Sequence, residues 1–372
     1  MNRTVLGTLT PAQFLRRHWQ KKPLHVKGAL PEIRDRFCAA ELRALACRED
    51  VESRLVTCTR RRWDVVHGPF RPGPFKQPPG TQWSLLVQGV DLHDEKARAL
   101  LEQFNFVPYA RLDDVMLSLA PPGGGVGPHF DSYDVFLLQV CGRRRWRIGA
   151  QRDLRLVDGA PLRILRKFQP QYELEAGPGD LLYLPPQYAH DGIALTECIT
   201  CSIGFRAPTR QELAAAFLQW LPDALHLEGR YRDPGLAPQA DPAAIGRAMV
   251  EQAERMLSVR WGRRHVETFL GEYLTEPKPQ VWFTAPRRPF AFDAFVKQAR
   301  KRGIRLSLKT RMLYRGARVF INGESIVMPV HARNAIKALA NERGISFWHS
   351  RSSWATRTVY EWYRAGYVDL GS

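Results

Sequence analysis

Two histidines and one aspartate have the residue types and the spacing of a metal site. His129 and Asp131 follow a glycine-rich loop, Pro121 to Pro128, and precede an apolar run that predicts a strand. Side chains two apart on a strand point to the same face, so both can bind one ion. His190 follows a second apolar run, Leu181 to Leu184, that two prolines end. Two imidazoles and one carboxylate, with other coordination positions open, form the facial triad of non-haem Fe(II) oxygenases.

The alternative interpretation is structural, with His129 a hydrogen-bonded strand residue and Asp131 a solvated carboxylate at a sheet edge. Packing requires neither a polar residue at the start of an apolar strand nor a histidine at the end of another. The glycine loop lacks the Gly-Lys-Ser/Thr ending of a phosphate-binding loop. Its glycines are expected to let the backbone pass close to a metal or a substrate.

A cationic residue is expected in the same interior. After the turn Cys141 to Arg143, the side chains of Arg144, Trp146 and Ile148 share one face of a predicted strand. Trp and Ile suit a barrel interior, so Arg144 should point inward, toward the metal. A buried guanidinium requires an anion, and a carboxylate that accepts two hydrogen bonds is its natural partner. The alternative is a hairpin that carries solvated arginines.

Composition sets the broad class. A chain of 372 residues with 44% hydrophobic and 10% aromatic residues predicts an ordinary globular protein of two or three domains. Since it contains no run of 18 apolar residues and no apolar signal segment at its N-terminus, we expect a soluble, cytoplasmic protein. The net charge of +18 favours acidic partners such as RNA. Cys198 and Cys201 alternate with apolar residues, which predicts buried free thiols rather than a zinc or redox pair.

Longer segments resemble one family. The sequence is similar to JmjC-type 2-oxoglutarate oxygenases, and within them to the bacterial ribosomal oxygenases that hydroxylate an arginine of large-subunit ribosomal protein sixteen. The resemblance is strong over about the first two hundred residues and looser beyond them. The segments that show it are GGGVGPHFDSYDVFLLQ, GRRRWRIG, PGDLLYLPPQYAHDG, SIGFRAPTR, FLRRHWQKKPLHVKGA from Phe14 to Ala29, and WSLLVQGVD from Trp83 to Asp91.

The resemblance implies a mainly β fold with helical additions. Residues 1–208 would form the JmjC catalytic domain, a double-stranded β-helix (jelly roll, cupin-like) barrel. Residues 209–275 would be a helical dimerisation region, and residues 276–372 a winged-helix-like C-terminal domain. A homodimer is implied as well.

The resemblance also implies the site and its ligands. His129, Asp131 and His190 would hold Fe(II), with 2-oxoglutarate as cosubstrate and O2 as oxidant. Arg144 would bind the distal carboxylate of 2-oxoglutarate, and Ser202 and Ser118 are candidates for hydroxyl contacts to it. Candidate substrate contacts are Tyr133 and Asp134 beside the metal ligands, and further carboxylates available for this role are Asp113, Asp114 and Asp191.

Outside the site, several local signals predict elements. Thr209 and Glu212 form a capping box that begins a helix, and Asp241 with Pro242 predicts the start of another. Asn322 and Gly323 predict a hairpin turn. The Arg, Gly and Pro-rich stretch from Arg60 to Pro79 is expected to be a long surface loop. Three arginines of the C-terminal domain would suit phosphate groups, although nucleic-acid binding is not required: Arg311, Arg315 and Arg318.

The expected activity is hydroxylation of an arginine in large-subunit ribosomal protein sixteen, which gives hydroxyarginine, succinate and carbon dioxide. Such a substrate is itself basic, so a local acidic patch is required on a chain of this net charge. Other readings are a histidine hydroxylase of another ribosomal protein, a cupin that uses a different metal for a non-oxidative reaction, and a binding module that acts through its basic C-terminal domain.

Overall fold

The structure, a computed structural model, describes residues 5–73, 82–238 and 240–371. The chain divides into two compact units, each built from separate stretches of sequence. The first unit contains Met1–Ala207, Pro277–Thr310 and Asn341–Ser372, and the second contains Pro208–Glu276 and Arg311–Ala340. The domain boundaries expected at residues 208 and 275 stay predictions.

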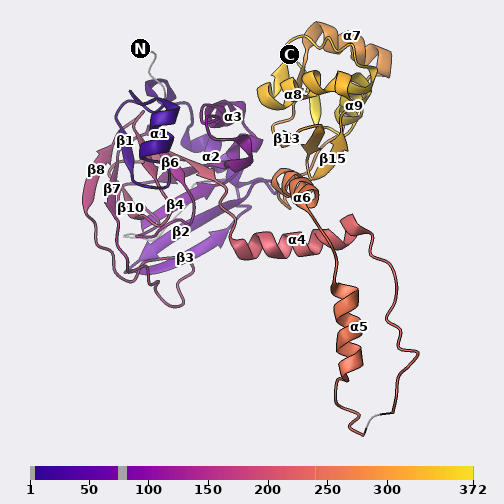
Figure 1. Cartoon of the computed structure of the whole chain (residues 1–372). Coiled ribbons are helices and arrows are strands. Elements are labelled where there is room, and N and C mark those ends of the chain that lie inside the picture. Colours follow the sequence, from indigo (N-terminus) through magenta and orange to yellow (C-terminus); the bar gives the residue numbers. More distant parts are fainter. Residues whose placement is uncertain (1–4, 74–81, 239, 372) are drawn as a thin grey trace. The chain divides into compact units, whose positions relative to one another are not determined.

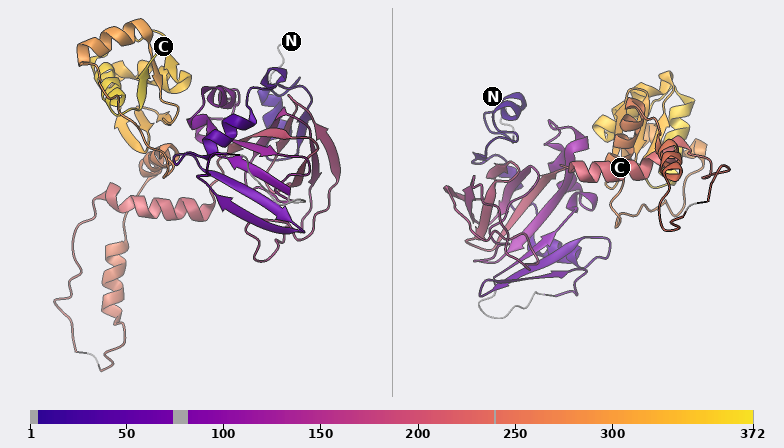
Figure 2. Two further views of the ribbon diagram at one scale, coloured as in Figure 1. Left: turned by 180° about the vertical axis from the view of Figure 1, so that it is seen from behind. Right: turned by 60° about the horizontal axis from the view of Figure 1, so that its bottom comes forward.

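The first unit contains a β-barrel built from two antiparallel sheets (Figures 1 and 2). The larger sheet has the order β1-β9-β6-β11-β5-β4-β2-β3, and the smaller has the order β10-β7-β8. The strands are β1 (Leu24–Val26), β2 (Ser53–Thr59), β3 (Arg62–His67), β4 (Gln82–Val87), β5 (Leu112–Ala120), β6 (Val135–Cys141), β7 (Arg144–Gly149), β8 (Tyr172–Ala176), β9 (Leu181–Leu184), β10 (Ala189–Ala194) and β11 (Cys198–Phe205).

Both faces of β6 are buried, which explains why the strand is apolar except for Gln139 and the terminal Cys141. Phe136 and Leu138 pack into the main core. Val135 and Leu137 point the other way, into a second core between the two sheets that Trp146 also joins. Burial of each such side chain contributes about 1.5–3 kcal/mol to stability. A slip of one residue would move every side chain of β6 to the opposite face, so this burial fixes the register of the strand.

Helices cover the outer face of the larger sheet. Thr10 caps α1 (Pro11–Arg17) in a capping box with Gln13, and the fully buried Phe14 of this helix packs against the rings of Phe136 and Tyr183. Further helices of this unit are α2 (Ala39–Ala46), α3 (Glu95–Glu102), α7 (Phe292–Arg302) and α9 (Ser353–Arg364), and a small sheet has the order β16 (Gly344–Ile345), β12 (Ile304–Leu306), β17 (Val368–Leu370).

The second unit joins helices to a β-hairpin sheet. Its elements are α4 (Arg210–Leu225), α5 (Arg247–Leu257), α6 (Arg263–Thr275), β13 (Met312–Arg315), β14 (Arg318–Ile321) and β15 (Glu324–Val327), followed by α8 (Arg333–Glu342). The capping box at Thr209 and the hairpin turn at Asn322 and Gly323 are confirmed.

Within the second unit, α6 packs on two partners. The Trp220 indole of α4 donates a hydrogen bond to Glu272, with 2.6 Å between the heavy atoms. Gly271 faces β14 closely, since a Cβ there would lie 2.3 Å from the Phe320 ring. Helix α5 lies apart from α4 and α6 (Figures 1 and 2) and buries none of its own residues against the described part of the chain.

Three predictions about elements are wrong. The strand after the glycine loop begins at Val135 and not at His129, because Gly127 adopts a left-handed φ of 79° and Pro128 follows it. Part of the expected surface loop is β3, which a tight turn at Arg60 and Arg61 joins to β2; both residues have positive φ. Residues 74–79 of that loop lie outside the described residues.

The third concerns α5, which begins at Arg247 after the cap Gly246 and not at Pro242. Residues 241–244 form only a turn, in which the Ala244 N–H donates to the Asp241 carbonyl. Cys198 and Cys201 are buried free thiols, as predicted. Across the described residues, no helix is long and apolar enough to cross a membrane.

Candidate active site

The structure brings His129, Asp131 and His190 together. Their ligand atoms all lie within 4.8 Å of one another, and Nε2 of His190 is 3.7 Å from Oδ2 of Asp131. Main-chain hydrogen bonds hold the two segments side by side. His129 and His190 exchange N–H to carbonyl bonds of 2.9 and 2.8 Å, and the Gln187 N–H donates to the Asp131 carbonyl at 2.7 Å. An isolated β-bridge between His129 and His190 therefore positions the ligands, where the sequence predicted that a continuous strand would do so.

The tautomers of both histidines suit metal binding. Nδ1 of His129 donates to the Gly127 carbonyl at 2.8 Å, and Nδ1 of His190 donates to the Tyr188 carbonyl at 2.9 Å. Carbonyls only accept, so the proton sits on Nδ1 and the lone pair on Nε2 is available to a metal. Burial lowers the pKa of His190 to about 4, with His129 adding to the effect and Asp131 opposing it. His190 is neutral at pH 7, and the trio fits a divalent metal.

Glycines let the chain segments around the triad approach one another. A Cβ on Gly125 would lie 2.6 Å from the Gly192 carbonyl oxygen, and a Cβ on Gly192 would lie 2.5 Å from the Trp146 ring. The close neighbour of Gly125 is thus a protein atom, whereas the sequence suggested a metal or a substrate for the glycines of its loop. The small size of Gly125 and Gly192 sets the distance between the glycine loop, β10 and β7.

The triad opens into a cavity of about 440 Å³ between the two sheets. Its wall combines residues of the larger sheet with residues of the smaller one, so closing the barrel creates the space. From the larger sheet come Ser84, Met116, Ser118, Val135, Leu137, Thr200 and Ser202, and from the smaller one Arg144, Trp146 and His190.

Arg144 is the cation of this cavity. Only 5% of the residue is exposed, and its guanidinium lies 5.6 Å from the centre of the Trp146 ring. Nε and Nη2 are buried without a hydrogen-bond partner among the described residues. A buried charge without a partner is strongly unfavourable, so the position requires an anion. Ser118 and Ser202 share this wall, and the Ser118 hydroxyl donates to the Thr200 carbonyl at 3.3 Å.

One stretch of the cavity wall is acidic. Asp113, Asp114 and Tyr133 line it. The Asp131 carboxylate and burial raise the pKa of Tyr133, so its phenol stays protonated. This is the kind of local patch that a basic substrate requires on a basic protein.

Asp134 does not face the cavity, and the structure does not support it as a substrate contact. It is fully buried, outside the set of described residues that line the wall, and it accepts hydrogen bonds from Tyr183 at 2.6 Å and Gln20 at 2.9 Å. Neighbours on a strand face opposite sides, which separates Asp134 from Val135. Asp191 is likewise engaged, by the Arg147 guanidinium at 2.5 Å.

Several wall residues were missed from the sequence. Arg54 and Met116 lie on strands whose alternation could have revealed an inward face. Arg163 belongs to a segment without periodicity, so only the fold shows that its guanidinium lies 4.6 Å from the centre of the Phe130 ring at the cavity.

Two protein families match parts of this chain. The JmjC domain family matches residues 99–213, and the ROXA-like winged helix family matches residues 258–369. The chain is 37% identical to ribosomal protein uL16 3-hydroxylase of Escherichia coli K12 over 339 residues, 90% of this chain and 89% of that protein.

Solved structures extend the likeness to the whole fold. The X-ray structure of E. coli ycfD matches with a TM-score of 0.84 and 33% identity over 98% of both chains. The complex of that ribosomal oxygenase with cobalt and 2-oxoglutarate matches with a TM-score of 0.82 over 98% of this chain and 99% of the other. The C-terminal part is thus a winged-helix domain, and the chain belongs to the ribosomal oxygenase family of JmjC-domain proteins.

Proposed function

We propose that this chain is an Fe(II)- and 2-oxoglutarate-dependent hydroxylase of an arginine side chain in large-subunit ribosomal protein uL16. One observation carries the proposal. The unpartnered, buried guanidinium of Arg144 lies in the same cavity as the His129, Asp131 and His190 triad. The Arg144 cation requires a carboxylate, and the nearby set of two histidines and one carboxylate suits iron. Together they fit a keto-diacid such as 2-oxoglutarate bound at iron. The choice of uL16 as the substrate comes from the name of a relative, ribosomal protein uL16 3-hydroxylase.

Each residue then has a defined task. The three ligands hold the metal, and the neutral imidazole of His190 need release no proton to do so. Arg144 binds the distal carboxylate of 2-oxoglutarate, and the hydroxyls of Ser118 and Ser202 are placed to contact the same molecule. When bound, Fe(II) with 2-oxoglutarate and O2 supplies the oxidising chemistry that converts a C–H bond to C–OH and yields succinate and carbon dioxide.

The acidic wall would receive the substrate. The carboxylates of Asp113 and Asp114 can accept hydrogen bonds from a guanidinium, and the Tyr133 ring offers an aromatic face to the same cation. Met116 and Val135 line the wall and would exclude water from the alkyl part of the arginine. Binding the head of the side chain in this way leaves its carbon atoms to be presented to the metal.

Mass spectrometry of digested ribosomal proteins separates this activity from its closest alternative. After incubation with the enzyme, Fe(II) and 2-oxoglutarate, we expect one added oxygen on an arginine of uL16. Addition to a histidine of another ribosomal protein would instead establish the histidine hydroxylase. Absence of succinate from every incubation would favour a non-oxidative cupin or a binding module.

We also propose a homodimer formed through the helical region. Large apolar side chains of this region are exposed, including Leu218 at 65% and Leu257 at 77%. Exposed apolar side chains in this number are typical of a region that packs against another protein chain. Light scattering should give twice the mass of one chain, and the mass of one chain would contradict the dimer.

Nucleic-acid binding is not required for this function. Two of the arginines expected to suit phosphate have protein partners: Arg315 pairs with Glu267 at 3.0 Å, and Arg318 donates to Ser325 at 3.0 Å. A ribosomal substrate would place the enzyme in the cytoplasm.

A further inference from the structure

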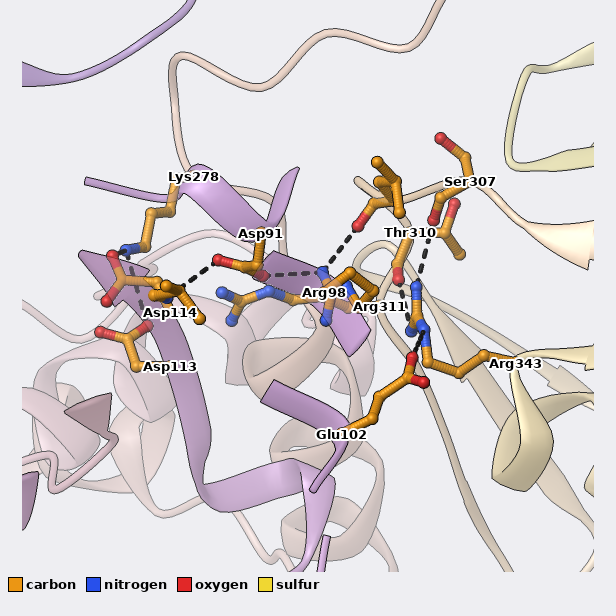
Figure 3. A network of polar contacts seen from close by, with 12 residues as sticks. Asp91, Arg98, Glu102, Asp113, Asp114, Lys278, Ser307, Thr310, Arg311 and Arg343 are labelled. Carbon is orange, nitrogen blue, oxygen red and sulfur yellow. Dashed lines mark hydrogen bonds and ion pairs between the residues drawn. The ribbon is translucent and has the colours of Figure 1, made fainter. Parts of the chain in front are cut away.

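A lysine from far along the chain meets the acidic wall of the cavity. Lys278 follows α6, and its ammonium donates a 3.0 Å hydrogen bond to Oδ2 of Asp114, which lies 164 residues earlier. The same ammonium is 3.6 Å from Oδ1 of Asp113 (Figure 3). Both carboxylates line the cavity. Lys278 lies outside the JmjC segment matched at residues 99–213, whereas Arg206, which is 3.5 Å from Oδ1 of Asp113, lies within that segment.

The contact leaves one side of the Asp114 carboxylate to the cavity. Lys278 bonds to Oδ2, while Oδ1 lies beside Gly204, where an added Cβ would be 3.6 Å from it. Gly204 is itself part of the cavity wall. An ionised carboxylate has lone pairs on both oxygens, so Lys278 on one does not prevent a guanidinium from binding the other.

Asp114 depends on a cation for its charge. The residue is 7% exposed. Burial raises its pKa to about 6, and Asp113 and Asp91 add to the rise, while Lys278 opposes it. Without the ammonium the carboxyl would hold its proton at neutral pH and could no longer attract a cation.

The backbone beside Asp114 is held by a second polar chain. The Val115 N–H donates to Oδ1 of Asp91 at 3.0 Å, and Oδ2 of Asp91 is 2.8 Å from Arg98 (Figure 3). Arg98 in turn donates to the Leu308 carbonyl at 2.7 Å. The start of β5 is therefore fixed, and the side chain of Asp114 is left for Lys278 to orient.

We propose that Lys278 is a positioning residue that holds the Asp114 carboxylate against the cavity and so sets the affinity of the enzyme for a cationic substrate side chain. The inference rests on the proposed function, because it assigns Asp114 to the substrate arginine.

Steady-state kinetics with uL16 tests the role in the full-length enzyme. Lys278→Met should raise the KM for uL16 by about tenfold or more, with little change in kcat or in the KM for 2-oxoglutarate. Lys278→Arg, which keeps the charge, should restore most of the affinity. Lys309→Met is the matched control, since Lys309 pairs with Asp50 at 3.6 Å and neither residue is among the described residues of the cavity wall.

The pH profile gives a readout that a loss of stability would not produce. The KM defect of Lys278→Met should shrink between about pH 7 and about pH 9, because the carboxyl of Asp114 ionises again as pH rises. The other titratable groups that act on Asp114 or feel its charge are present in both proteins: Asp113, Asp91, Tyr133 and Cys201.

Two kinetic outcomes would overturn the inference. An unchanged KM would show that Lys278 does not position Asp114, and a lowered KM would show that it competes with the substrate. Thermal unfolding checks that Lys278→Met folds, and Lys278→Gln replaces it if it does not.

A substrate-independent measurement separates this inference from the proposed function. Carboxyl ¹³C NMR, assigned with Asp114→Asn, should show Asp114 titrating about one pH unit or more higher in Lys278→Met than in the wild type. Equal titration in both proteins overturns the role of Lys278 even if uL16 is hydroxylated. If the titration of Asp114 shifts clearly in Lys278→Met but the wild-type enzyme leaves uL16 unmodified, the proposed substrate is overturned instead.

Discussion

At the level of single residues, the site contains polar groups that lack a bonding partner among the residues that the structure describes. His129 and His190 each use one ring nitrogen on a carbonyl and keep the other for a metal. Arg144 is a buried cation without a partner in the described chain. Such groups are unfavourable in the isolated protein and favourable once their ligands bind, which is a mark of a functional site rather than of a stabilising network.

Replacing the carboxylate ligand should remove activity without unfolding the protein. For Asp131→Ala we expect turnover to fall by more than about 100-fold, because the metal loses the only carboxylate of its protein triad. The Asp131 side chain is 23% exposed, so the free energy of unfolding should change by less than about 1 kcal/mol. Succinate assays and thermal unfolding measure the two effects. Asp158→Ala, at an exposed carboxylate, is the control, and near-normal turnover in Asp131→Ala would refute the metal assignment.

Replacing Arg144 should weaken the binding of 2-oxoglutarate without lowering the stability of the protein. Arg144→Met loses a charge-assisted contact to 2-oxoglutarate of about 1.5–3 kcal/mol, so the KM for 2-oxoglutarate should rise about 10- to 100-fold. The ligand-free variant should unfold at the same temperature or higher, because the substitution removes an uncompensated buried charge. Arg143→Met, at an exposed arginine of the preceding turn, is the control. An unchanged KM would show that Arg144 does not hold the cosubstrate.

At the level of elements, the site depends on how closely β7, β10 and the glycine loop pack. Gly192 faces Trp146, and Gly125 faces the Gly192 carbonyl. His190 lies two residues before Gly192 on β10, so any displacement of this strand moves a metal ligand.

A single methyl group at this contact tests that dependence. In Gly192→Ala the new Cβ would lie 2.5 Å from the Trp146 ring, which the core holds in place. We expect a loss of about 1–3 kcal/mol in the free energy of unfolding and weaker metal binding, measured by denaturation and metal titration. Gly235→Ala, which meets no atom within 4 Å, should be neutral in both assays. Wild-type metal affinity in Gly192→Ala would contradict the proposed packing constraint.

Sequence reasoning reached the parts of the site that depend on residue type and strand alternation. The histidines and aspartate were identifiable because packing does not call for them, and Arg144 because it shares a strand face with Trp146. The carboxylates that could bind the substrate could not be ranked from the sequence. Asp113, Asp114 and Asp134 look alike in sequence, and only the burial of Asp134 against Tyr183 removes it from the cavity. The contact of Lys278 with Asp114 depends wholly on the tertiary fold.

At the level of the whole molecule, the helical region has apolar surface that its own unit does not cover. Met249 and Met256 are seven residues apart on α5, hence on one side of the helix, and are 46% and 42% exposed. Burial against a second copy would remove this surface from water.

Charges on that side of α5 should prevent self-association. The double variant Met249→Glu and Met256→Glu should have the mass of one chain by light scattering, since desolvated like charges oppose burial. The matched control reverses the ion pair on the opposite side of the helix, with Arg247→Glu and Glu251→Lys. A control that dissociates equally would argue against a specific interface, and a charged variant that remains dimeric would place the interface elsewhere.

The most direct test of the central claim is incorporation of ¹⁸O from labelled O2 into uL16, located by tandem mass spectrometry. The account predicts one ¹⁸O on a single arginine, dependent on Fe(II) and 2-oxoglutarate and absent with Asp131→Ala. Succinate formation without label in any ribosomal protein would contradict uL16 as the substrate. Label that persists in Asp131→Ala would contradict the assignment of the His129, Asp131 and His190 triad as the reacting centre.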